Sequence, residues 1–154
     1  DNVYIADRNG HAIRKFSLPT GAVTTLAGTG EAGFADGTSG TAKFNNPMGL
    51  ALNGNILFVA DIFNHRIRAV NTRTGEVVTV AGSGSAGFAD GSLQSAQFNA
   101  PHSLLWDNGA LLVFDTDNHR IRRVEVGQIT FSAPVTNATV GMTAATVQAP
   151  APMR

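Results

Sequence analysis

Short apolar runs alternate along the chain with turns rich in glycine and polar residues. In one clear unit, an apolar run at 48–52 is followed by an Asn-Gly pair and by a second apolar run at 56–60. Charged and apolar residues then alternate over 66–70, and β-branched residues fill 77–80. Such runs are typical of strands, and the Asn-Gly pair between two of them predicts a tight hairpin. The pattern therefore predicts four antiparallel strands in this unit.

The same residue pattern returns every 54 residues, as the positions of Asp7, Asp61 and Asp115 show. Helical periodicity is absent. No long window keeps apolar residues on one helical face, and glycine recurs throughout. A repeat of this length in an all-β chain indicates the blades of a β-propeller, in which each unit covers its neighbours. The repeated positions that we expect to support the blades structurally are Asp7, His11, Ile13, Asp61, Asn64, His65, Ile67, Asp115, Asn118, His119 and Ile121.

Two of the copies carry a specific family pattern. The residues Asn64-His65-Arg66-Ile67-Arg68, and their counterparts from Asn118 to Arg122, resemble NHL repeats. The first copy departs from the pattern, with Gly10 in place of Asn and Ala12 in place of Arg. The resemblance covers residues 3–131. It implies four-stranded antiparallel blades set around a central channel.

The repeat count predicts an incomplete ring of fewer than three blades. We assign residues 1–46 to a partial blade with its inter-blade loop, 47–100 to a complete blade with its loop, and 101–131 to a third blade. The remaining residues, 132–154, are rich in Ala, Thr and Pro and are expected to form an extended tail.

Such an open array needs something to cover its two end blades. The first blade begins at what should be its second strand, so we expect its outermost pairing to be vacant. The tail of another copy could fill that edge by strand addition. We therefore expect a segment of a larger protein, or a subunit that associates with further NHL blades from the same or an identical chain.

Composition narrows the function classes. Eleven Lys and Arg residues balance eleven acids, so no net field draws the chain to nucleic acid. The absence of cysteine removes disulfides and thiolate metal sites. The apolar runs are far shorter than the roughly twenty residues of a membrane helix. The glycine-rich loops are not followed by helices, so they indicate long turns with positive φ rather than a phosphate-binding loop.

The recurring histidines could be taken for the ligands of a metal site. His11, His65 and His119 stand at equivalent points of different blades, and rotation about the propeller axis would separate them. We expect each ring to hold the turn between the second and third strands of its blade, and the recurring aspartates to cap turns. We predict no metal and no cofactor.

Two alternative functions follow from the resemblance. Some NHL-type propellers are lyases that hold a metal in the channel with histidines from several blades, and this chain offers His102 outside the repeat.

Other NHL-type propellers bind RNA through a positively charged face. A charged residue at every second position is also typical of a solvated strand face, which is the interpretation we prefer. The basic stripe consists of Arg14, Lys15, Arg66, Arg68, Arg120, Arg122 and Arg123.

The preferred function is a non-catalytic scaffold or protein-binding module. The candidate partner surface is the pair of loops at 28–46 and 82–100, because loops on a rigid array commonly carry recognition. Within them we single out Phe34, Asp36, Phe88 and Asp90. Asn137 begins an Asn-Ala-Thr acceptor triplet in the Pro-rich tail, which favours an extracellular, glycosylated protein.

Overall fold

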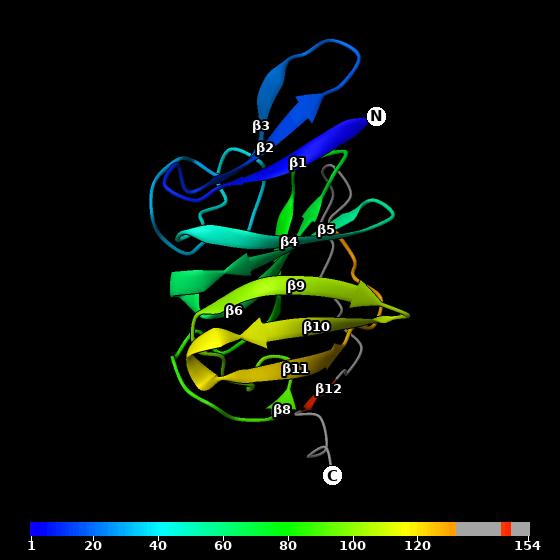
Figure 1. The fold of residues 1–154 in the computed structure, drawn as a ribbon. Coiled ribbons are helices and arrows are strands. Elements are labelled where there is room, and N and C mark those ends of the chain that lie inside the picture. The colour runs from blue at the N-terminus through cyan, green and yellow to red at the C-terminus, as the bar shows by residue number, and fades with distance from the viewer. Residues whose placement is uncertain (132–145, 149–154) are drawn as a thin grey trace.

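Three antiparallel sheets make up the fold. A computed structural model describes residues 1–131 and 146–148. In Figure 1 the sheets lie one upon the next in chain order, with the first sheet and the N-terminus at one end of the stack and the third sheet at the other. Within the described residues the helical segments are two single turns, η1 (Ile62–Asn64) and η2 (Thr116–Asn118). The all-β prediction is confirmed.

The second sheet has four strands in sequence order. The predicted tight hairpin is present, but Asn53 pairs with Ile56, so the turn residues are Gly54 and Asn55 rather than Asn53 and Gly54. Gly54 has a φ of 57°, which glycine adopts at little cost. The strands are β4 (Pro47–Asn53), β5 (Ile56–Asp61), β6 (Arg66–Asn71) and β7 (Val77–Ala81).

The first sheet has three strands, β1 (Asn2–Asp7), β2 (Ala12–Ser17) and β3 (Val23–Ala27). By the repeat, β1 corresponds to β5, and β1 pairs with β2 alone among the described residues. A Cβ on Gly49 of β4 would touch the backbone of His102 and Ser103 in the next sheet. The first strands of neighbouring sheets therefore converge, as strands nearest a propeller axis do. The predicted vacant edge of β1 is present among the described residues, but it faces this inner side instead of the outermost position.

The third sheet contains a strand that the repeat does not predict. Its order is β8-β12-β11-β10-β9, and β12 is Thr146–Gln148. Val147 pairs with Val124 on one side and with Gly91 on the other. Of the tail, the structure describes these three residues alone, and they form a strand. The other strands are β8 (Gly91–Ser92), β9 (Pro101–Asp107), β10 (Ala110–Asp115) and β11 (Arg120–Glu125).

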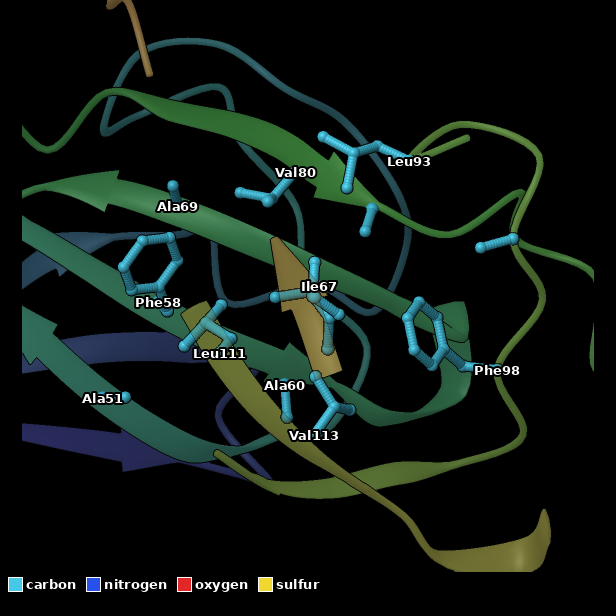
Figure 2. Packing of buried hydrophobic residues seen from close by; sticks show 13 residues of the cluster. Ala51, Phe58, Ala60, Ile67, Ala69, Val80, Leu93, Phe98, Leu111 and Val113 are labelled. Carbon is cyan, nitrogen blue, oxygen red and sulfur yellow. The ribbon is translucent and has the colours of Figure 1, made fainter. Parts of the chain in front are cut away.

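The apolar core lies between the sheets. One cluster fills the space between the second and third sheets, with Phe58, Ile67, Leu111 and Val113 turned toward one another in Figure 2. The Phe58 ring stacks on Trp106 with centroids 5.2 Å apart. A second cluster joins the first and second sheets. Every sheet thus depends on a neighbour to bury its apolar face.

No helix among the described residues has the length and apolar character needed to cross a membrane.

Candidate functional site

The centre of the repeated site is a buried arginine on the third strand of a blade. The Arg68 side chain has 0% exposure and forms an ion pair with the equally buried Asp61, 2.7 Å from Nη1 to Oδ2. The guanidinium also donates to the backbone carbonyls of Lys43 (3.0 Å) and Ala35 (2.7 Å) in the preceding loop. A side chain of β6 therefore fixes the loop that connects the first sheet to the second.

Asp61 accepts hydrogen bonds with both of its carboxylate oxygens. Oδ1 accepts the Asn45 N–H at 2.7 Å, while Oδ2 accepts the Asn64 amide at 2.8 Å. The same Asn64 amide donates to Gly33 O at 2.8 Å. Burial raises the pKa of the Asp61 carboxyl, and the positive charge of Arg68 opposes that rise. Asp61 thus bonds Asn64 in its own turn and also connects that turn to the preceding loop, a second role that the sequence did not predict.

Two residues of the inter-blade loop complete this arrangement. The Phe34 ring lies under Arg66 and Arg68, with its centroid 3.8 and 4.8 Å from the two Cζ atoms. Asp36 pairs with Arg68 at 2.7 Å, and its other oxygen accepts the Thr79 N–H at 3.1 Å. Guanidinium groups are attracted to ring faces and to carboxylates in this geometry. The loop is therefore held firmly on the second sheet.

The third blade repeats the arrangement at the equivalent positions. Arg122 is fully buried and pairs with Asp115 at 2.9 Å and with Asp90 at 2.6 Å. Asn118 bridges Asp115 Oδ2 and Gly87 O, each at 2.8 Å. Phe88 lies 4.0 Å from the Cζ of Arg120. Two copies of one network thus stand side by side in the array.

The first blade holds only a reduced form of the network among the described residues. Asp7 pairs with Arg14 at 2.7 Å, and both side chains are about one-third exposed, at 36% and 32%. Asp7 also accepts the Gly10 N–H at 3.0 Å, so here the aspartate does cap its turn. The Arg14 hydrogen bond lowers the pKa of Asp7, with the Gly10 N–H as the second cause. Gly10 stands where the other units have the bridging asparagine.

The recurring histidines connect one blade to the next. His11 Nδ1 accepts the Asn46 N–H at 3.2 Å, and His65 Nδ1 accepts the Ala100 N–H at 3.1 Å. Each acceptor therefore lies on one blade, while each donor immediately precedes the first strand of the following blade. This corrects the expectation that the ring holds the turn of its own blade. His119, the equivalent residue of the third blade, is exposed.

The repeated isoleucines show which blade faces are covered. Ile13 and Ile67 are fully buried, whereas Ile121 is 45% exposed. Ile121 lies on the third sheet, on the face away from the second.

The basic stripe is not a uniformly solvated face. Arg68 and Arg122 have 0% exposure and point into the networks described above. The expectation that both lie on a solvated strand face is therefore wrong. The alternation of charged and apolar residues concealed this, because a buried arginine with several acceptors produces the same pattern as an exposed one.

The residues proposed for other chemistry do not come together. His102 is half-buried on β9, and the three repeated histidines lie in turns that belong to separate sheets. Within 1–131 and 146–148, no three His, Asp or Glu side chains form a group that could hold a metal ion. Asn137 lies outside the described residues. Phe34 and Phe88 are 46% and 42% exposed, so the loops present aromatic surface while being anchored.

Sheets stacked about converging inner strands, with each blade bonded to the loop before it, define a segment of a β-propeller. No family profile matches the sequence. It is 36% identical over 143 residues to NHL repeat-containing protein 2 of Bos taurus, covering 84% of this chain and 20% of the relative. It is also 36% identical over 136 residues to Protein SUPPRESSOR OF QUENCHING 1, chloroplastic, of Arabidopsis thaliana, covering 81% and 13%. The chain belongs to the NHL-repeat β-propeller family.

A solved structure agrees with this assignment. An auxiliary nutrient binding protein of Bacteroides thetaiotaomicron superposes with a TM-score of 0.71 at 28% identity, over 79% of this chain and 34% of the other. The chain thus spans one-fifth or less of the length of these two curated relatives and about one-third of the solved structure.

Proposed function

We propose that this chain is a non-catalytic propeller segment that acts as a scaffold or protein-binding module, with further NHL blades covering its two end faces. The observation that carries the proposal is that the faces left open at the two ends are the same faces that the middle of the array buries.

The open face of the third sheet carries three exposed apolar side chains beside the ion pair of Arg123 and Glu125. Leu105, Phe114 and Ile121 are 53%, 39% and 45% exposed. Their counterparts by the repeat are Ala51, Ala60 and Ile67 in the second sheet, which the third sheet covers to between 8% and 0% exposure. An apolar surface of this kind in contact with water is unfavourable and marks an interaction site.

The first sheet leaves the opposite type of face open. Val3, Ile5 and Val23 are 44%, 42% and 61% exposed. Their counterparts in the second sheet are Leu57, Val59 and Val77, which are 1%, 0% and 0% exposed because the first sheet covers them. One end of the array therefore matches the other. A partner for either end is another blade of this kind, from a longer chain or from an identical copy.

The anchored loops are the proposed surface for a protein partner. Phe34 and Phe88 lie at equivalent positions of adjacent blades, and the side chains of Asp36 and Asp90 are each 42% exposed. Aromatic side chains held rigid by cation–π contacts lose little conformational entropy when a partner binds. Such residues are common anchors in protein interfaces.

Assembly by strand exchange and an extracellular location belong to this proposal as well. Exchange through the tail would require β12 to leave the third sheet of its own chain, where it pairs on both sides. The extracellular location rests on the sequence of the tail and its Asn137 triplet.

Light scattering on the 154-residue chain tests the proposal. We expect a mass above the 16.0 kDa of one chain, or binding of a dye that reports exposed apolar surface. Ile121→Glu should weaken the association, because a carboxylate would have to lose its hydration at the interface. Asn55→Glu places the same charge in the exposed β4–β5 turn of the middle sheet and should leave the association unchanged. A 16.0 kDa monomer that unfolds cooperatively and binds no dye would overturn the proposal.

A further inference from the structure

The fourth-strand position of the third sheet can be compared residue by residue with that of the second. In the second sheet, Val77 pairs with Val70 and bridges to Gly37. In the third sheet, Val147 pairs with Val124 and with Gly91, which are the counterparts of Val70 and Gly37 by the repeat. Val147 therefore takes the place of Val77. The repeat itself assigns that place to Phe131, which follows Val77 at the same interval as Gly91 follows Gly37.

The sequence shows why two segments suit one position. Thr130-Phe131-Ser132-Ala133-Pro134 and Thr146-Val147-Gln148-Ala149-Pro150 share their Thr, Ala and Pro and have an apolar residue after the Thr. When the two segments are aligned on these shared residues, the expected Phe131 falls on the observed Val147. The chain thus carries two versions of one strand.

The segment that follows β11 does not occupy this position. Residues 126–131 belong to no strand in the structure. Val126, Ile129 and Phe131 nevertheless pack against the apolar cluster between the second and third sheets. The first version of the strand is therefore held against the apolar core between these two sheets.

We propose that the position between β11 and β8 is shared by two segments of this chain. Thr146–Gln148 occupies it in the structure, and the segment containing Thr130 and Phe131 occupies it in a second conformation. Both segments pair with the same two strand edges, so exchange trades equivalent backbone hydrogen bonds. When the local segment pairs, the second version of the strand is released. This inference does not depend on the proposed partners of the end faces.

Proline scanning in the full chain tests the exchange, because a strand paired on both sides loses a ladder hydrogen bond wherever proline is placed. Val147→Pro should transfer pairing to the local segment and slow exchange of the Phe131 amide hydrogen at least tenfold. Thr130→Pro should block the second conformation and slow exchange of the Val147 amide hydrogen. Thr130→Ala keeps the N–H and should leave the Val147 amide unchanged.

Thermal unfolding provides an independent readout. Each single proline should lower the midpoint by a few degrees, while the double variant should lower it by clearly more than the sum, since both occupants are then lost. The proposal is overturned if Val147→Pro alone is as damaging as the double variant, including outright failure to fold. It is also overturned if Thr130→Pro leaves the Val147 amide as exchangeable as before.

Discussion

His65 Nδ1 accepts the backbone N–H of Ala100 across 3.1 Å and 35 positions of sequence. The acceptor ends the η1 turn of the second blade, while the donor immediately precedes the first strand of the third. Ala100 is only 6% exposed, so its N–H has little access to water. A side-chain hydrogen bond thus joins one blade to the next.

Replacing this ring should weaken the junction. We expect His65→Leu to lower the free energy of unfolding by about 1–3 kcal/mol, because it leaves a buried N–H without its acceptor. His119→Leu is the matched control, since His119 shares the left-handed backbone, with φ of 53° against 50°, but is exposed. Urea unfolding of both variants makes the comparison. Equal losses would mean that the backbone conformation, and not the hydrogen bond, determines the effect.

The buried arginine should be more sensitive than the exposed one. Arg68→Met removes the partner of a carboxylate with 0% exposure and should cost about 3–5 kcal/mol. Arg14→Met disrupts the partly exposed pair with Asp7 and should cost less than about 1 kcal/mol. Chemical denaturation measures both. Similar losses in the two variants would contradict the assignment of Arg68 as the centre of the network.

Asp7 should show the effect of Arg14 on its titration. Its hydrogen bond to Arg14 holds the pKa of the Asp7 carboxyl below 3.8. Because the folded pKa is depressed, the pair contributes stability above that value and loses it as the pH falls through the folded pKa. Carbon NMR of the carboxyl measures the titration directly. In Arg14→Met the pKa should rise, and an unchanged titration would exclude Arg14 as the cause.

Strands β4 and β9 can approach closely because Gly49 has no side chain. A Cβ on Gly49 would lie 2.7 Å from Ser103 Cα and closer still to His102 O. Gly49→Ala should therefore push β4 and β9 apart and cost about 1–3 kcal/mol. Gly40→Ala is the control, because a Cβ there meets nothing within 4 Å. Trp106, which stacks on Phe58 between the same two sheets, provides a fluorescence signal for the unfolding measurement.

Much of the fold could be predicted from the chain itself. The β-branched and alternating runs mark the strands of the second sheet closely, and the fixed period predicts that the sheets repeat. The hairpin turn is displaced by one position because Gly54, and not Asn53, adopts the positive φ. Strand β12 could not be predicted from the period, since the period points to Phe131 and the strand is formed by the later copy of that sequence.

The site was harder to predict for a physical reason. The repeat identifies Asp61, Asn64 and His65 as special, but their partners are mostly backbone atoms of the preceding loop or the following blade. Backbone donors and acceptors leave no signature in the residue types. Arg68 was assigned to the wrong environment because nothing local distinguishes a buried guanidinium from a solvated one.

The positions of these partners along the chain also set an order for folding during synthesis. Arg68 finds the carbonyls of Ala35 and Lys43 already made when it leaves the ribosome, so its loop can close at once. His65 must wait until Ala100 has been translated. Because chains fold from the N-terminus as they emerge, the histidine hydrogen bond from a blade to its successor cannot form until that successor has begun to be made. A pause in translation after Arg68 and before Ala100 would prolong the life of an intermediate that has the arginine contacts but lacks the histidine hydrogen bond.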